Sequence, residues 1–217
     1  MLEARLKKKY ANLIDDKFPN KKDFSISLDH VLKCSYYNQG CDGGYSYLVS
    51  KFFNEFEMLL DSCYDKYSGG CSKNCKNSNY EKFTLRVANN RYVGGSYGRC
   101  SEDKILKEVY DNGPIVVSLE PDYSFMFYKS GIYMSPNNNW FVKELPKPEW
   151  EKVDHSVVLV GWGVEKINNK KVKYWILQNS WGSNWGENGF MKFIRGQDHL
   201  GIESICETAD PIFTVEN

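Results

Sequence analysis

The sequence predicts an α+β fold, with helices in the first part of the chain and strands in the second. Apolar side chains recur at three- and four-residue steps within residues 45–60, whereas β-branched and aromatic runs bounded by turn residues dominate after residue 113. Helices first and strands later are typical of a chain whose α and β regions are segregated. We therefore expect a helical, cysteine-rich part over residues 1–92 and a β-rich part over residues 93–217.

The first part is expected to be mainly helical. Residues 1–9 end in a run of lysines, where the helix dipole favours positive charge, and no capping residue precedes them, so this helix is expected to start upstream of the chain. Residues 28–33 fit a short helix and residues 45–60 a longer one. From residue 61 to residue 90 the chain is rich in Gly, Ser, Asn, Lys and Cys, which predicts a loop held by disulfides rather than by a core.

One helix and several strands are expected in the second part. Ser101 can cap a helix that ends where Gly113 and Pro114 follow. The runs of β-branched and aromatic residues predict an antiparallel sheet or barrel. The four runs are Ile115–Leu119, Val157–Val164, Lys173–Gln178 and Phe190–Ile194. Residues 135–153 show no period and are expected to form an exposed loop.

Charge and hydropathy argue against two classes of partner. The chain carries 28 basic and 28 acidic residues, and neither sign collects into a long run. This balance does not favour binding to nucleic acid or to an anionic membrane surface. No run of about 18 apolar residues occurs, so no membrane span is expected.

Five of the seven cysteines lie between Cys34 and Cys75, a density typical of an oxidised, secreted domain. The first ten residues, MLEARLKKKY, are nevertheless rich in charge and do not resemble a signal peptide. A zinc site is the alternative use of clustered cysteines. No tight Cys-x2-Cys repeat occurs, however, and no histidine is paired with these cysteines, so we expect disulfides and no metal.

Two segments of the second part carry candidate catalytic residues. Of the three histidines, His155 directly precedes a strand that would hold its ring in place. The other segment is YWILQNSWGSNWGENG, residues 174–189. Taken singly, each segment has an ordinary structural interpretation. The first could be a histidine at the edge of a strand, and the second could contain tryptophans that pack in a core. The two together form a far more specific pattern.

This pattern resembles the papain family of cysteine peptidases, whose members carry a histidine-led strand followed by Asn-Ser-Trp-Gly and Trp-Gly-Glu. The resemblance implies a two-lobed fold, with a helical lobe and an antiparallel β-barrel lobe, and catalytic roles for His155, Asn179 and Trp181. The Asn179 carboxamide would accept a hydrogen bond from Nδ1 of His155, and Nε2 would face a thiol. Trp181 would cover that hydrogen bond and exclude water from it.

Further segments narrow the resemblance to the cathepsin C type, the dipeptidyl peptidases. These segments are MLEAR at the start, CSYYNQGCDGGYSY over residues 34–47, YVGGSYGRC over residues 92–100, and GIES over residues 201–204. The resemblance covers nearly all of the chain and implies a bound chloride ion. The implied substrate-binding residues are Gly43, Gly44, Tyr45 and Tyr92, and the implied chloride-binding residues are Tyr45, Tyr47 and Tyr92. The alternative for the three tyrosines is a buried phenol bonded to the backbone.

The same resemblance implies an incomplete catalytic domain. In this family the nucleophilic cysteine begins the central helix a few residues ahead of the segment that matches MLEAR, so the nucleophile and the N-terminal half of that helix are expected upstream of Met1. The family pairing of cysteines would join Cys34 to Cys71 and Cys63 to Cys75. Cys41 would lack its upstream partner, and Cys100 and Cys206 would be free thiols, of which Cys206 departs from the family pattern.

The function implied is the removal of dipeptides from polypeptide N-termini by thiol acyl transfer. Peptides or proteins would be the substrates, and an exclusion domain of the full-length protein would supply the exopeptidase specificity. The loop over residues 135–153 lies where cathepsin C is cut into two chains. The implied location is a lysosome or a similar acidic vacuole, or the outside of the cell after secretion. An oligomer is possible. Two alternatives stand, a papain-like endopeptidase and an inactive papain-fold binding protein.

Overall fold

The computed structural model describes residues 1–65, 70–72, 83–136 and 153–215. The chain divides into two compact units, one made of Met1–Arg91 and Thr208–Asn217 and the other of Tyr92–Glu207. The division lies within one residue of the expected boundary. The C-terminal segment, however, belongs to the first unit rather than to the β-rich part, because its strand lies beside a strand of the first unit.

Four α-helices form in the first unit. They are α1 (Leu2–Lys9), α2 (Ala11–Lys17), α3 (Leu28–Cys34) and α4 (Ser46–Glu55). The sequence predicted α1 and α3 but not α2. The expected helix over residues 45–60 is too long, because Phe56 adopts an extended conformation and the N–H of Met58 donates to the carbonyl of Leu85 at 2.7 Å.

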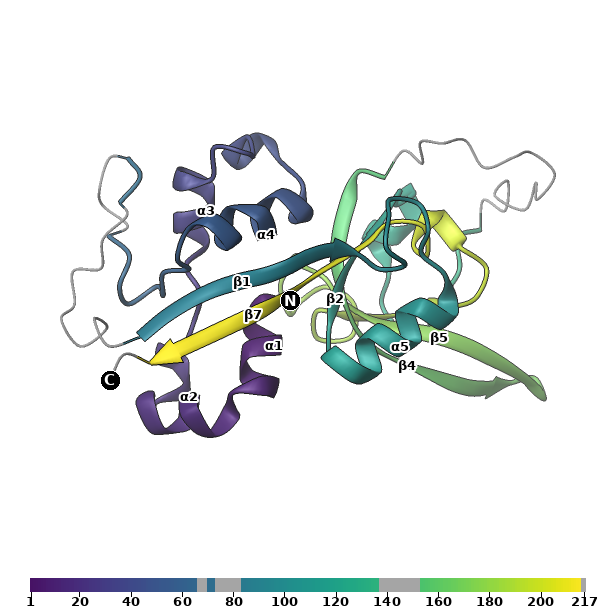
Figure 1. Cartoon of the computed structure of the whole chain (residues 1–217). Helices are drawn as coiled ribbons and strands as arrows, with labels where there is room; N and C mark the ends of the chain where they lie inside the picture. The colour runs from purple at the N-terminus through teal and green to yellow at the C-terminus, as the bar shows by residue number, and fades with distance from the viewer. Residues whose placement is uncertain (66–69, 73–82, 137–152, 216–217) are drawn as a thin grey trace. The chain divides into compact units, whose positions relative to one another are not determined.

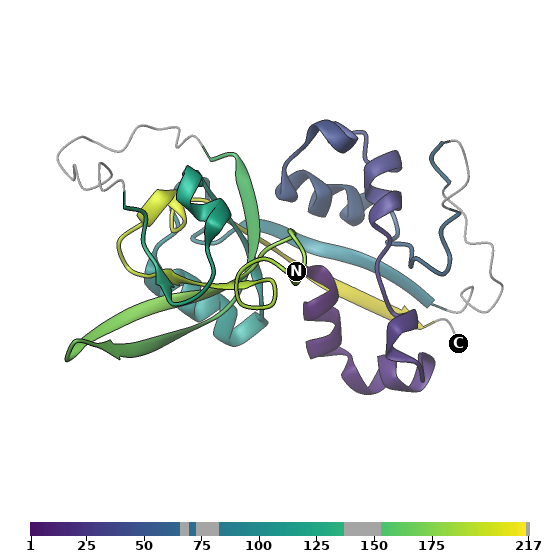
Figure 2. The same ribbon diagram turned by 180° about the vertical axis from the view of Figure 1, so that it is seen from behind.

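Two long strands complete the first unit. β1 (Phe83–Tyr92) and β7 (Cys206–Val215) are neighbours in the sheet. Figures 1 and 2 show α1 and α2 on one side of this strand pair and α3 and α4 on the other. The core of the unit contains several aromatic rings, among them Phe18, Phe24, Phe52, Phe53 and Phe213. The prediction of a loop over residues 61–90 is wrong for the last part of that range, because β1 begins at Phe83.

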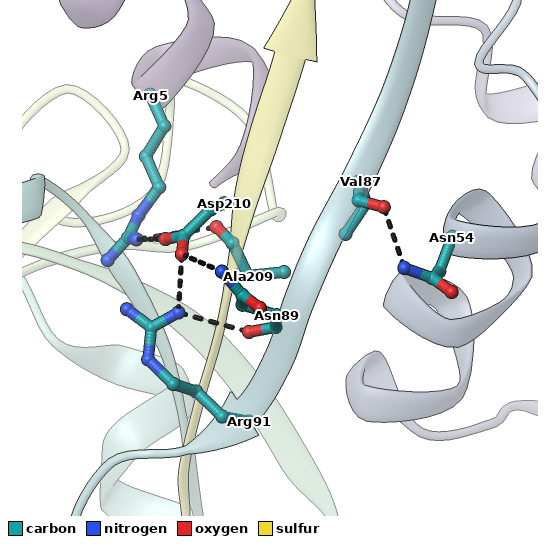
Figure 3. Close-up of polar contacts among 7 residues, drawn as sticks. All are labelled: Arg5, Asn54, Val87, Asn89, Arg91, Ala209 and Asp210. Atoms are coloured by element: carbon teal, nitrogen blue, oxygen red, sulfur yellow. Dashed lines mark hydrogen bonds and ion pairs between the residues drawn. The ribbon is translucent and has the colours of Figure 1, made fainter.

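A polar cluster joins α1 to both strands of this unit (Figure 3). The guanidinium of Arg5 is buried and lies 3.5 Å from Oδ1 of Asp210, and it also donates to the carbonyl of Ala209 at 3.3 Å. Oδ2 of Asp210 accepts from Arg91 at 2.9 Å and from Asn89 at 3.3 Å. One carboxylate of β7 thus connects the first helix with β1.

The second unit contains the sheet that carries the candidate catalytic residues. The strand order is β7-β2-β4-β5-β6-β3. Its strands are β2 (Ile115–Leu119), β3 (Ile132–Tyr133), β4 (His155–Ile167), β5 (Lys170–Gln178) and β6 (Phe190–Ile194). The sequence predicted the ends of β2 and β6 to the residue. It underestimated β4 and β5, which form one long hairpin (Figure 1) closed by Asn168 and Asn169, both at positive φ.

One α-helix and several 3-10 helices flank these strands. α5 (Glu102–Asn112) ends at Gly113 as expected, although the Ser101 side chain makes no capping hydrogen bond. The 3-10 helices of the described ranges include η1 (Lys21–Asp23), η2 (Gly40–Asp42), η4 (Tyr123–Phe127) and η6 (His199–Gly201). Most of the expected loop over residues 135–153 lies outside the described residues. No helix in the described part of the chain is long and apolar enough to cross a bilayer.

The cysteines follow the expected pattern where they can be seen. Cys34 and Cys71 form a disulfide, with a Cα–Cα distance of 4.8 Å. Cys63 is also disulfide-bonded, and its expected partner, Cys75, lies outside the described residues. The free cysteines of the described ranges are Cys41, Cys100 and Cys206.

Candidate active site

His155 and Asn179 lie at the same end of the sheet in the second unit. His155 is the first residue of β4, opposite Leu119 of β2, and Asn179 directly follows the last residue of β5. Because β4 and β5 are antiparallel, with Val158 opposite Gln178, the start of one strand meets the end of the other. Regular backbone therefore positions both residues.

A hydrogen bond joins the two side chains. Nε2 of His155 lies 3.0 Å from Oδ1 of Asn179. The same oxygen accepts the backbone N–H of Ser180 at 2.8 Å, so it acts as an acceptor and Nε2 is the ring nitrogen that carries the hydrogen. In the neutral ring, Nδ1 is then unprotonated and can act as a general base.

The expected hydrogen bond between Nδ1 and Asn179 is therefore wrong. The sequence identifies the pair but not the rotation of the ring, which depends on its packing. The His155 ring lies 5.0 Å from the Trp181 ring at 30° and 6.0 Å from the edge-on ring of Phe125. In this orientation Nε2, not Nδ1, meets Asn179.

Trp181 lies against the ring of His155, where its indole can cover the hydrogen bond between His155 and Asn179. Its indole is tilted over the imidazole, is 40% exposed, and makes an edge contact with Phe125 at 5.6 Å. A ring over the pair reduces the access of water, which strengthens the electrostatic part of the hydrogen bond. The catalytic roles expected for His155, Asn179 and Trp181 stay predictions that this geometry fits.

Asn179 is itself buried, with 9% of its surface exposed. Its backbone N–H donates to the carbonyl of Gly189 at 2.9 Å. Its amide nitrogen, Nδ2, has no hydrogen-bond partner among the described residues. An unsatisfied buried donor costs about 1–3 kcal/mol. The carboxamide is thus oriented by its oxygen, which bonds both His155 and Ser180.

The loop over residues 179–189 is held by Glu187. Oε1 of Glu187 accepts from the hydroxyl of Tyr128 and from the backbone N–H of Gly131, both at 2.9 Å. Gly186 has a φ of +57°, and a Cβ there would lie 2.5 Å from a main-chain carbonyl oxygen. Only glycine fits this turn without strain. The Trp-Gly-Glu part of the sequence pattern therefore builds the loop that presents Trp181.

Asp122 anchors the 3-10 helix η4, which carries Phe125 against the His155 ring. Oδ1 of Asp122 accepts the backbone N–H of Phe125 at 3.1 Å and the hydroxyls of Ser124 and Tyr133, each at 2.7 Å. Burial of Asp122 opposes its ionisation. The hydrogen bonds it receives, including one from the Ser135 hydroxyl, outweigh burial and lower the pKa of Asp122 to about 2.

The expected substrate-binding glycines lie on the surface of the first unit. Gly43 is exposed and has a φ of +112°, and a Cβ there would meet no atom within 4 Å. A Cβ on Gly44 would collide with the side chain of Asn38, whose Oδ1 accepts the N–H of Tyr45 at 2.8 Å. This turn therefore requires glycine, and both main-chain groups of Gly43 are bonded within it, its N–H to the carbonyl of Gly40 at 3.3 Å and its carbonyl to the N–H of Gln39 at 3.0 Å. Substrate binding by Gly43 and Gly44 stays a prediction.

The three tyrosines of the expected chloride site belong to different units. Tyr45 and Tyr47 are in the first unit and Tyr92 is in the second. Tyr45 is 67% exposed, so a buried structural phenol does not describe it. Tyr92 is half-buried and makes an edge contact with the Tyr97 ring at 5.6 Å. Chloride binding stays a prediction.

Among the residues that the structure describes, no group of three or more His, Cys, Asp or Glu side chains could hold a metal ion.

Comparison with known proteins identifies the family. A family model described as papain family cysteine protease matches residues 10–209. The chain belongs to this family. Its α+β architecture is accordingly a papain-like fold, and a solved structure of digestive procathepsin L 3 from the larval midgut of Tenebrio molitor has the same fold. That structure matches 85% of this chain and 55% of its own, with a TM-score of 0.63 and 25% identity.

Two curated relatives in the papain family are similar over most of this chain. Dipeptidyl aminopeptidase 1 of Plasmodium falciparum (isolate 3D7) is 32% identical over 284 residues, which cover 98% of this chain and 39% of that protein. Cathepsin C of Schistosoma mansoni is 34% identical over 193 residues, which cover 86% of this chain and 40% of that protein. The chain thus spans about two fifths of the length of these relatives.

Sequence reasoning assigned no role to two residues that support the papain-family pair. Phe125 contacts the rings of both His155 and Trp181, but it stands in a short apolar stretch without a period. Asp122 was likewise not singled out. Asp is itself a preferred residue at the start of a helix, and in the structure the Asp122 side chain caps η4.

Proposed function

We propose that this chain is the larger part of the catalytic domain of a cysteine peptidase that removes dipeptides from the N-termini of peptides or proteins. The observation that carries the proposal is the bond between His155 Nε2 and Asn179 Oδ1, which leaves Nδ1 as the base. The similarity to a dipeptidyl aminopeptidase and to a cathepsin C supports dipeptide removal.

The nucleophile in this proposal is a cysteine of a longer protein, in a segment ahead of Met1. The family's nucleophile string, a cysteine at the start of the central helix before MLEAR, has no counterpart within the chain. Of the cysteines in the described ranges, Cys34 is in a disulfide and Cys206 is 1% exposed, so neither can attack a substrate.

The chemistry then follows from the His155 tautomer. Nδ1 takes the thiol proton, and the thiolate attacks the scissile carbonyl carbon. The resulting imidazolium returns the proton to the leaving amine, and the C–N bond breaks to give a thioester. His155 next takes a proton from water, whose oxygen attacks the thioester, and the thiol is released. Asn179 keeps the ring in register throughout, because its oxygen accepts from Nε2 in both protonation states.

The proposal also includes the substrate specificity of the peptidase and the compartment in which it works. An exclusion domain of the full-length protein would block the far end of the substrate site, and chloride at Tyr45, Tyr47 and Tyr92 would shape the binding of the second substrate residue. The cysteine density supports an oxidising setting such as a lysosome-like vacuole or the exterior.

The test uses two forms of the protein, this chain and a longer form that includes the upstream segment. Each is assayed with a dipeptide-coumarin substrate, with the same substrate blocked at its amine, and with an epoxide that labels active-site thiols. The expected result is that only the longer form is labelled and active, and only on the free-amine substrate. Equal turnover of the blocked substrate would favour the endopeptidase alternative.

A second comparison separates an enzyme from a binding protein. In the longer form, His155→Ala is expected to abolish both labelling and turnover, whereas Ser183→Ala, an exposed change in the loop over residues 179–189, leaves them intact. A longer form that folds, carries no reactive thiol and binds peptide without turnover would place the binding-protein alternative first. Labelling of the shorter form would show that one of its own cysteines is the nucleophile.

A further inference from the structure

A cluster of hydrogen bonds in the second unit is centred on the carboxylate of Asp122. Its Oδ1 caps η4 by accepting the backbone N–H of Phe125 at 3.1 Å, and it also accepts the hydroxyl of Tyr133 at 2.7 Å. Its Oδ2 accepts the hydroxyl of Ser135, whose own backbone N–H donates to Nε2 of His199 at 2.8 Å. Ser135 and His199 are 2% and 3% exposed, so the cluster reaches the interior of the unit. The proposed peptidase chemistry assigns no step to these groups.

A carboxylate suits the centre of this cluster. The groups around it are donors, namely the hydroxyls of Tyr133, Ser135 and Ser124 and the backbone N–H of Phe125. An ionised carboxylate is an acceptor only, and its two oxygens have room for all of these hydrogen bonds. Because these bonds lower the pKa of Asp122 to about 2, the side chain stays charged at the pH of any peptidase assay.

The 3-10 helix η4 has little apolar packing of its own apart from Phe125. Phe125 is fully buried, whereas more than half of the surface of each of three other residues of η4 is exposed: Tyr123, Met126 and Phe127. A 3-10 helix of five residues has weak internal hydrogen bonds and is not stable alone. The carboxylate of Asp122 is therefore a main support for the position of the Phe125 ring.

The Phe125 ring is in turn a support for the imidazole of His155. Two aromatic rings contact the imidazole, Trp181 at 5.0 Å from the loop over residues 179–189 and Phe125 at 6.0 Å from η4. Phe125 and Trp181 also contact each other at 5.6 Å. If η4 moved, the imidazole would gain room to rotate about its Cβ–Cγ bond. Its Nε2 would then leave Oδ1 of Asn179, which it meets at 3.0 Å.

We propose that Asp122 is a positioning residue for His155, which acts through Phe125 to hold the ring rotation that keeps Nε2 on Asn179 and leaves Nδ1 as the base. The catalytic consequence rests on the proposed peptidase function. The effect on the imidazole does not, and it can be measured in this chain by itself.

The split between kcat and KM provides the kinetic test, in the longer, active form. Asp122→Ala is expected to lower kcat about 10-fold or more and to change KM less than about twofold, because a rotating imidazole is less often in its reactive orientation. Asp122→Asn keeps an oxygen that can accept the Phe125 N–H, so it is expected to retain kcat within about threefold, although it is less stable. An unchanged kcat in Asp122→Ala, or an equal loss in both variants, would overturn the proposal.

Nuclear magnetic resonance of this chain, made with 15N-labelled histidine, tests the imidazole directly. The chain has three histidines, and His155→Ala identifies the signals of His155. At neutral pH the Nε2–H proton of His155 is expected to be visible, because the bond to Asn179 and the neighbouring rings slow its exchange with water. Asp122→Ala is expected to accelerate that exchange about 10-fold or more. An Nε2–H proton that is absent from the unmodified chain, or equally protected in Asp122→Ala, would overturn the proposal.

Two further variants separate positioning from a general loss of stability. Val109→Ala creates a small cavity in α5, which contributes no residue to the Asp122 cluster, so it is expected to lower Tm but to leave the His155 Nε2–H protected. Loss of protection in Val109→Ala as well would overturn the proposal. Phe125→Leu keeps an apolar side chain but removes the aromatic ring, and it is expected to accelerate exchange as Asp122→Ala does. It also decides the matter if Asp122→Ala does not fold, since full protection in Phe125→Leu would refute the link.

The two readouts distinguish a failure of this inference from a failure of the proposed function. A longer form that has no peptidase activity, but whose His155 Nε2–H loses protection in Asp122→Ala, would refute the proposed function and support the positioning role. A longer form that is active, and in which Asp122→Ala changes neither kcat nor the protection of His155, would support the proposed function and refute the positioning role.

Discussion

Lowering the pH is expected to destabilise the first unit, because His30 is buried there as a neutral ring. The side chain is 3% exposed and lies against the rings of Phe52, Phe53 and Tyr64, at centroid distances of 5.6, 5.8 and 5.5 Å. Its Nδ1 accepts the backbone N–H of Leu59 at 3.4 Å. Burial lowers the pKa of His30 to about 4.

The magnitude follows from the two pKa values. His30 has a pKa near 6.5 in the unfolded chain and about 4 in the folded one, so the unfolded state takes up the proton first as the pH falls. Its favourable contribution is complete above about pH 6.5 and is lost as the pH falls toward 4. Between about pH 7.5 and pH 5 the free energy of unfolding is expected to fall by about 2 kcal/mol. Burial also lowers the pKa of His199, which acts in the same direction in the second unit.

Urea unfolding followed by far-UV circular dichroism at the two pH values measures this loss. His30→Phe is the matched variant, since it keeps an aromatic ring among aromatic neighbours and removes the titrating group. The variant is expected to be less stable at neutral pH, because Leu59 loses its acceptor, but to lose about 2 kcal/mol less on acidification. Equal losses in the two proteins would refute the argument that His30 is buried in its neutral form.

Three further changes test the second unit. In a longer, active form, Asn179→Ala is expected to lower kcat about 10- to 100-fold with little change in KM, since His155 loses its orienting acceptor; an unchanged kcat would contradict that role. Gly186→Ala is expected to lower stability by about 1–3 kcal/mol by thermal unfolding, because its positive φ and the nearby Phe190 carbonyl leave no room for a Cβ. Asp122→Asn is expected to cost about 2 kcal/mol, because several charge-assisted hydrogen bonds are lost; a loss under about 0.5 kcal/mol would contradict this account.

The helices and strands that the sequence predicted correctly are those whose limits are set by residues close to them in the chain. β2 and β6 are short, apolar and bounded by turn residues, and α5 is bounded by Ser101 and Gly113, so their limits follow from a few neighbouring residues. The segment that matched the papain family places Asn179 directly after a predicted strand, and β5 does end at Gln178.

The elements that were missed are stabilised by distant partners. β1 contains Asn89 at positive φ, and β7 contains Asp210 and Pro211, residues that are uncommon within strands. Each is a strand because the other lies beside it, more than 100 residues away in the chain. Likewise, the residues after Glu55 continue the apolar period of α4, yet they pair with β1 instead of extending the helix.

The tie between the first helix and the last strand sets an order of events during synthesis. Arg5 and Asp210 are separated by 205 residues, so at typical rates of about 5–20 residues per second Arg5 waits roughly 10–40 seconds for its carboxylate. The first residues of β1 and β7, Phe83 and Cys206, are 123 positions apart, so β1 waits roughly 6–25 seconds for β7. The first unit therefore cannot complete its fold as it leaves the ribosome, whereas all the strands from β2 to β6 are available to one another before β7 is made. The part of the chain that is made first is the part that finishes last.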